Sequence, residues 1–329
     1  VLLSPLGARL HARTTAFTRA DSAWLSRVTF GLDPTSVSEY QRLGREKFLD
    51  AQLHPAADPP ALTAATAALE VSTLTAEQRV TRVRAEQQRI NALPDEDSKQ
   101  QARTALNRAG NEAVYQTSKR ALMRDITSPW QLREQMTWFW MNHFTVFQGK
   151  ANVRWTLAEY EDTLRAHALG RFSDLVMASL TSPAMLEYLD NTQSAVNRIN
   201  ENYARELMEL HTLGVDGGYT QKDVTEVARV FTGWTLDRPR GGSGAFQFDA
   251  RLHDPGDKTV LGHTIKGSAR NGQDEGERVL DLLARHPSTA TFIATKLALR
   301  FVSDDPPPAL VGRLAARFRD TDGDLQAVM

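Results

Sequence analysis

The residues of this chain best suited to chemistry lie in one stretch, NENYARELMELHTLGVDGGYTQKDVTEVARVFTGWTL, which runs from Asn200 to Leu236. Its first part predicts a helix over about 200–213, because Gly214 is the residue type that most often ends a helix. Positions three and four apart share a helix face, which places two carboxylates and a guanidinium on one polar stripe. The stripe consists of Asn202, Arg205, Glu206 and Glu209. Carboxylates buried together raise one another's pKa, and such a pair can bind a divalent ion or transfer protons.

A histidine lies on the most apolar predicted helix, QLREQMTWFWMNHFTVF, which spans Gln131 to Phe147. Its apolar residues recur at helical spacing and form one continuous face, made of Leu132, Met136, Phe139, Trp140, His143 and Phe147. We expect this helix to be among the most buried elements and to pack against the 200–213 helix. On such a face His143 is either a core histidine with a satisfied hydrogen bond or a functional group, and the sequence leaves both readings open.

Two more histidines contribute to the candidate site. His211 lies on the 200–213 helix, about 140° from Glu206 around an ideal helix, so it cannot simply join both glutamates on one metal ion. His253 and Asp254 begin the segment HDPGDKTVLG, whose residue types polarise substrates or bind ions, although a polar hairpin tip would contain them too. The catalytic candidates are His143, Arg205, Glu206, Glu209, His253 and Asp254. A divalent metal ion, if bound, would take His143, Glu206 and His253 as ligands.

Four segments resemble the bacterial family called domain of unknown function 1800 (DUF1800). They are ENYARELMELHTLGVDGGYTQKDVTEVARVFTGW, WFWMNHF, HDPGDKTVLG and HPSTATFIATKLALRFVSDDPP. The resemblance extends from about Ala23 to the C-terminus, with a less similar insert near residues 60–115. It implies a mainly helical fold, and it implies no particular reaction because no activity is assigned to the family.

The periodicity of the whole chain predicts a mainly α fold, a multi-helical single domain with a small inserted β ribbon. Residues 1–20 form a loosely ordered lead, and the helical domain occupies 21–329. Thr220 is the expected N-cap of a helix that runs to about residue 232. Two polar helices over about 75–126 form a hairpin that projects or caps the core. The ribbon is expected within 235–267, after RPRGGSG, which lacks the spacing of a phosphate-binding loop and predicts a flexible loop instead.

Composition excludes several classes of site and partner. The 329 residues contain no cysteine, which excludes disulfides, thiolate nucleophiles and iron–sulfur clusters. The net charge of −1 argues against a general nucleic-acid surface, and no stretch is apolar enough to cross a membrane.

The chain opens on Val1 and its last residues resemble the start of a helix, so we expect the natural chain to continue. The sequence leaves a periplasmic, secreted or cytoplasmic location open.

Two functions fit these residues. The first is an enzyme with a polar or metal site built from His, Glu and Asp, acting on an unknown small molecule. The second is a non-catalytic helical module that binds a protein or polymer partner, in which the charged clusters are ion pairs between helices. The signatures HExxH, GxSxG and the Walker sequence are absent, so the sequence indicates no known reaction class.

Overall fold

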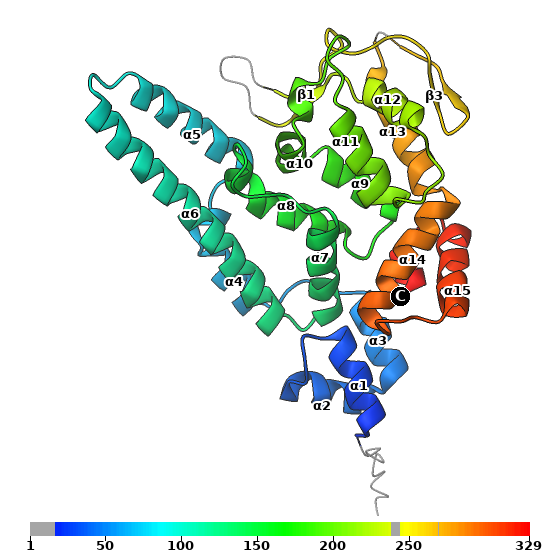
Figure 1. Ribbon diagram of the computed structural model, residues 1–329. Helices are drawn as coiled ribbons and strands as arrows, with labels where there is room; N and C mark the ends of the chain where they lie inside the picture. Colours follow the sequence, from blue (N-terminus) through cyan, green and yellow to red (C-terminus); the bar gives the residue numbers. More distant parts are fainter. Residues whose placement is uncertain (1–16, 238–243, 269) are drawn as a thin grey trace, which may run out of the picture.

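The computed structural model describes residues 17–237, 244–268 and 270–329, and these residues form a mainly helical body (Figure 1). The predicted lead up to residue 16 and most of RPRGGSG (238–243) lie outside the described residues.

The N-terminal helices are α1 (Arg19–Val28), α2 (Pro34–Leu43), α3 (Arg45–Leu53) and α4 (Pro60–Ala67), followed by the short 3₁₀ turn η1 (Glu70–Ser72). The first helix begins before the predicted Asp21, because Thr18 is the N-cap and Asp21 completes its capping box.

The predicted hairpin is present as α5 (Ala76–Asn91) and α6 (Glu96–Thr127), which project together from the body in Figure 1. Its lower half packs on α8 (Val153–His167), where Trp155 contacts Val80 and Val83. A buried ion pair joins the same elements, since Arg120 Nη2 lies 2.9 Å from Glu161 Oε2. The hairpin is therefore anchored to the core at its base.

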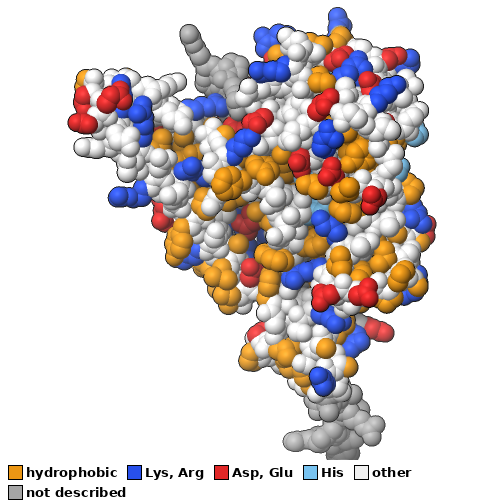
Figure 2. Space-filling view, in the orientation of Figure 1, with side chains coloured by type: hydrophobic (Ala, Val, Ile, Leu, Met, Phe, Trp, Pro, Cys, Tyr) orange, Lys and Arg blue, Asp and Glu red, His pale blue; other side chains and the backbone are white. Residues whose placement is uncertain are grey.

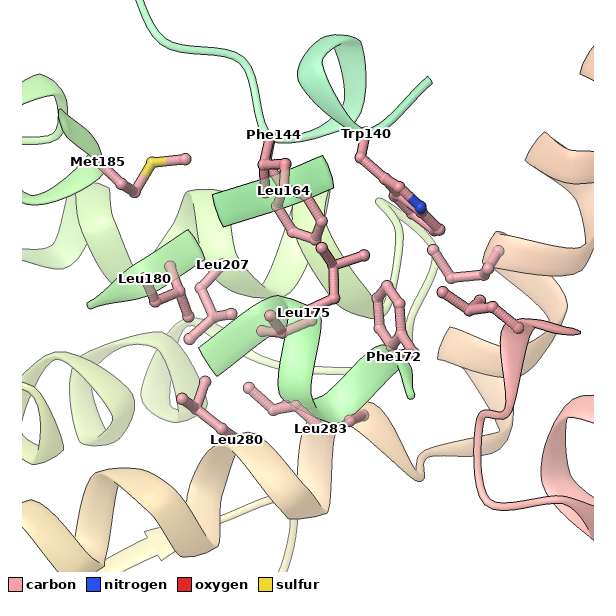
Figure 3. Packing of buried hydrophobic residues seen from close by; sticks show 14 of the residues in the cluster. Trp140, Phe144, Leu164, Phe172, Leu175, Leu180, Met185, Leu207, Leu280 and Leu283 are labelled. Atoms are coloured by element: carbon pink, nitrogen blue, oxygen red, sulfur yellow. The ribbon is translucent and has the colours of Figure 1, made fainter. Parts of the chain in front are cut away.

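The core is built around α7 (Gln131–His143), α8 and α9 (Phe172–Leu180), with α10 (Pro183–Tyr188) and α13 (Gly272–Ala284) beside them. Figure 3 shows Trp140, Phe144 and Phe172 gathered with leucines from α8, α9 and α13, and these three aromatic side chains are completely buried. The indole Nε1 of Trp140 donates to the carbonyl of Ala168 at 2.9 Å. The remaining C-terminal helices are α14 (Pro287–Phe301), α15 (Pro308–Asp320) and α16 (Leu325–Val328).

Two expectations for the aromatic helix are wrong. The helix ends at His143 rather than Phe147, because Phe144 leaves helical geometry and its carbonyl accepts a hydrogen bond from the Tyr160 hydroxyl at 2.6 Å. Phe147 is consequently 61% exposed. The helix also packs mainly along α8 and α3, and it meets the 200–213 segment at its C-terminal end, where His143 lies.

The 200–213 segment is a helix of two kinds. It begins as α11 (Glu201–Glu206) and continues as a π-helix, η3 (Leu207–Thr212), after which Gly214 adopts the left-handed conformation expected of it. The following helix, α12 (Gln221–Val230), has Thr220 as its N-cap with the predicted capping box.

The ribbon is two separate two-stranded antiparallel sheets within the described residues. One pairs β1 (Trp234–Leu236) with β2 (Phe246–Phe248), and the other pairs β3 (Lys258–Val260) with β4 (His263–Ile265). The first strand begins at Trp234, before the glycine-rich segment, whereas the ribbon was expected to follow that segment. Among the residues described, no helix has the length and apolarity needed to cross a membrane. Figure 2 shows charges of both signs interspersed over one face of the molecule.

Replacing Trp140 by alanine should lower the free energy of unfolding by about 3–5 kcal/mol, because it removes a fully buried indole and its hydrogen bond. Denaturant unfolding would measure the loss. Trp138 on the same helix is 48% exposed and is the matched control, since Trp138→Ala should cost much less. Equal losses for the two variants would contradict the packing described above.

Candidate functional site

The π-helix changes the position of His211 relative to the polar stripe. The amide of Leu213 donates to the carbonyl of Met208 at 2.8 Å, a bond between residues five apart. In this wider turn, residues five positions apart lie about one turn from each other. His211 is five positions after Glu206, so it lies closer to the face of that glutamate than the ideal-helix estimate of 140° allowed. The same change leaves Leu210 45% exposed.

His143 joins the end of α7 to this π-helix. Its Nε2 lies 3.0 Å from the backbone carbonyl of His211, and its Nδ1 lies 2.9 Å from the Nζ of Lys296 on α14. A carbonyl can only accept, so Nε2 carries the hydrogen and Nδ1 presents a lone pair to the lysine. Lys296 Nζ also lies 5.0 Å from the centre of the Phe292 ring. We call His143, His211 and Lys296 the α7–α14 cluster.

Burial favours the neutral forms of all three groups in the α7–α14 cluster. It is the largest cause that lowers the pKa of His143 well below the usual 6.5, and the positive charge of Lys296 adds to it. The same two causes lower the pKa of His211 to about 3. Burial also lowers the pKa of Lys296, although its side chain keeps some exposure. The two histidines are buried, whereas Lys296 is only half-buried.

The polar stripe, which we call the α11 stripe, continues from α11 onto η3; it is half-buried at Arg205, Glu206 and Glu209 and exposed at Asn202. Burial, with the nearby charge of Glu209, raises the pKa of Glu206 above its usual value. Glu209 Oε2 accepts a hydrogen bond from the Tyr219 hydroxyl at 3.3 Å, and Arg205 donates to Gln221 at 2.8 Å. Neither glutamate forms an ion pair within the described part of the chain, although Arg205 lies four positions before Glu209.

The ribbon candidates form a second, closed cluster. His253 Nε2 lies 3.3 Å from Glu275 Oε1, and Lys258 Nζ lies 2.6 Å from Glu275 Oε2. All three side chains have no exposed surface. We call these three residues the β3–α13 cluster. In this conformation no substrate reaches His253.

Asp254 links the ribbon to α12. Its Oδ2 lies 2.8 Å from the Nε of Arg229, and Arg229 Nη1 lies 3.0 Å from Glu226 Oε1. Glu226 in turn accepts from the backbone amide of Thr259 at 2.8 Å, and the amide of Gly256 donates to Asp254 at 2.9 Å. Arg229 therefore neutralises Asp254 and Glu226, not the glutamates of α11.

The predicted site residues thus fall into three neighbourhoods. His143 belongs to the α7–α14 cluster, Arg205, Glu206 and Glu209 lie on the α11 stripe, and His253 and Asp254 lie in the ribbon. No hydrogen bond or ion pair in the described residues joins His143 or Glu206 to His253. The residues that the structure describes also contain no group of three or more His, Asp or Glu arranged to hold a metal ion.

A cavity of about 160 Å³ between α6, α7 and α8 contains another perturbed carboxyl group. Burial and then the negative charge of Glu134 raise the pKa of Asp125 to about 7. Arg165 pairs with Glu134 at 2.6 Å and Arg124 pairs with Glu161 at 2.8 Å, so these two neighbouring carboxylates are neutralised. The lining includes Thr137, Trp138, Met141 and Leu157. This cavity is a second place where a proton could be exchanged.

Sequence reasoning missed Lys296 and Glu275 as members of polar clusters. Lys296 lies in the apolar run TKLALRF and Glu275 in EGERVL, and neither spacing differs from that of a surface residue on an amphipathic helix. The π-helix had no sequence signal either. Lys258 was seen beside His253, but its partner on α13 is seventeen positions away.

The family model described as "Protein of unknown function (DUF1800)" matches residues 23–329, nearly the whole chain. No curated protein matches the chain, and no solved structure matches it.

Acidification should destabilise the protein through His211. The unfolded chain binds this proton near pH 6.5 and the folded chain only near pH 3, so the unfolded state holds more protons between these values. The free energy of unfolding should therefore fall as the pH drops below 6.5, by up to about 1.4 kcal/mol per pH unit for this residue. His211→Asn should flatten the dependence between pH 5 and 7. An unchanged slope in His211→Asn would show that His211 is not buried in its neutral form.

Removing the charge of Glu275 should cost at least about 3 kcal/mol of stability, because it leaves the ammonium of Lys258 buried without its partner. Thermal or denaturant unfolding of Glu275→Gln would measure this. Glu277→Gln changes an exposed residue of the same helix and should stay within about 0.5 kcal/mol of the parent protein. A silent Glu275→Gln substitution would contradict the buried pair.

Proposed function

The chain belongs to the DUF1800 family, and we propose that it is an enzyme that uses the amine of Lys296 for general acid–base catalysis. One observation carries the proposal: the Nζ of Lys296 lies 2.9 Å from the Nδ1 of His143, while the lysine as a whole is only half-buried. A lysine that is half-buried and fixed by a neutral imidazole is arranged like a catalytic amine rather than a freely moving surface lysine.

The tautomer of His143 defines the direction of the hydrogen bond. With Nε2–H donated to the carbonyl of His211, Nδ1 accepts from Lys296 and holds the amine in one orientation. His143 is then a positioning residue, and the lysine is the group that meets the substrate. The lowered pKa of Lys296 brings its neutral form closer to the neutral pH range, where an amine is an efficient base.

A non-catalytic binding module is the second candidate function. It is supported by a cavity of about 260 Å³ between α5 and α6, whose apolar lining is Val71, Leu74, Val83, Leu106, Ala113 and Trp155. In that case a protein or polymer partner would be bound along the hairpin, and the α7–α14 cluster would only stabilise the core. The two functions predict different behaviour for Lys296.

Competitive amine labelling distinguishes them. The folded protein is treated with a trace of acetic anhydride at a series of pH values, and the acetylation of each lysine is measured by mass spectrometry. Lys296 should reach half of its maximal reactivity at a lower pH than Lys222, which is exposed on α12 and serves as the internal control. His143→Asn should change the reactivity of Lys296 and leave that of Lys222 unaltered. A Lys296 profile that coincides with that of Lys222, or no labelling at any pH, would contradict the proposal.

Activity is tested by deuterium exchange at the carbon next to the carbonyl in a panel of small oxo acids, followed by NMR. Any exchange that the protein catalyses should fall by at least about 100-fold in Lys296→Met, because general-base catalysis typically contributes that much. Lys222→Met should retain the full rate. Exchange that survives Lys296→Met would assign the catalysis to another residue.

A further inference from the structure

The β3–α13 cluster contains an amine and a carboxylate in contact within a closed site. Lys258 Nζ lies 2.6 Å from Glu275 Oε2 and 3.4 Å from His253 Nε2, and it also donates to the carbonyl of Asp254. The exposed fraction of each of the three cluster side chains is 0%. Because the amine and the carboxylate are already in contact, a reaction between them is intramolecular. It does not carry the entropy cost of bringing two separate molecules together.

His253 is oriented to accept a proton from the lysine. Its Nδ1 lies 2.8 Å from the carbonyl of Thr232, which can only accept, so Nδ1 carries the hydrogen. The lone pair of Nε2 can therefore accept a proton from Lys258 Nζ, at 3.4 Å, and once protonated Nε2 can donate to Glu275 Oε1, at 3.3 Å. One imidazole nitrogen is thus within reach of both the atom that must lose protons and the carboxylate that must gain them.

A backbone amide stabilises the other carboxylate oxygen. The amide of Ser268 donates to Glu275 Oε1 at 2.6 Å. If the lysine attacks the carboxyl carbon, negative charge develops on this oxygen, and an amide already directed at it lowers the energy of the tetrahedral intermediate.

Water is excluded by close packing around His253. A Cβ added at Gly272 would come within 2.5 Å of the His253 ring and 2.6 Å of Phe248, so only glycine allows α13 to lie this near. The rings of Phe248 and His253 are 5.2 Å apart. Exclusion of water favours the uncharged product of a condensation over the ion pair, because two buried charges are replaced by one amide.

From these contacts we propose that Lys258 and Glu275 form an intramolecular amide bond. The ammonium of Lys258 gives one proton to His253 Nε2, and its nitrogen attacks the carboxyl carbon of Glu275. In the tetrahedral intermediate, His253 returns its proton to Oε1, and the attacking nitrogen passes a second proton to Oε2. One of the two hydroxyl groups then gives its proton to the other, which leaves as water while the C=O bond forms again. One C–N bond forms, one C–O bond breaks, and no oxidant or other reactant is required.

The bond would fix β3 to the start of α13 covalently. Closing the loop between residues 258 and 275 reduces the conformational freedom of the unfolded chain and so stabilises the folded state, as other covalent cross-links do. It would also hold Asp254 and Arg229 in the contact that joins the ribbon to α12. This inference is independent of the proposed function, because it concerns a cluster that no substrate reaches.

The test is the intact mass of the purified protein, measured after denaturation. The bond predicts a mass lower by one water than the sequence requires, and a tryptic digest in which the peptides of Lys258 and Glu275 are found as one branched species. Lys258→Arg and Glu275→Ala should each have the full mass expected of their sequence, and Lys266→Arg, in the same ribbon, should still lack one water. His253→Gln should slow the mass loss when freshly made protein is followed over time.

A wild-type protein with the full mass, and with the two peptides separate after prolonged incubation at 37 °C, would overturn the proposal and leave the cluster a buried ion pair. This outcome does not depend on whether any variant folds, because it is read from the wild-type chain. A mass loss that persists in Lys258→Arg would overturn it too, since another residue would then be responsible.

Discussion

The hydrogen bond from His143 to the carbonyl of His211 is the interaction on which the candidate site depends. It is formed inside the aromatic core, where an unpaired polar group would cost several kcal/mol. Because a carbonyl accepts and never donates, the bond determines which nitrogen of His143 carries the hydrogen. That choice leaves Nδ1 to accept from Lys296, so a contact between α7 and the π-helix also orients an amine on α14.

The π-helix is what makes this arrangement possible. One extra residue in the turn shifts His211 around the helix axis and brings its carbonyl to the end of α7, and it leaves Glu206 and Glu209 on the half-buried side. Such local departures from α-helical geometry cost stability and are often found at functional sites. The ribbon pairs its charges differently. Lys258 and Glu275 form a fully buried ion pair, whereas the pair of Asp254 with Arg229 is partly exposed.

Sequence periodicity was sufficient for the helical fold, the α5–α6 hairpin, the Thr220 cap and the burial of Trp140, because these features follow from local spacing and from apolar faces. It failed where a contact between distant segments determines the geometry. The end of α7 is set by the Tyr160 hydroxyl, and the position of His211 is set by a π-helix that the residue types did not indicate. Lys296 could not be foreseen as a partner of His143, since the two residues are 153 positions apart.

The central claim is that His143 is neutral, with its hydrogen on Nε2, and accepts a hydrogen bond from Lys296. Long-range ¹H–¹⁵N NMR of the imidazole nitrogens reports both the tautomer and the protonation state directly. The structure predicts a pyrrole-like Nε2 and a pyridine-like Nδ1 for His143, unchanged across the neutral pH range, and a shift of Nδ1 in Lys296→Met. A His143 that titrates near pH 6.5, or that carries its hydrogen on Nδ1, would contradict the account.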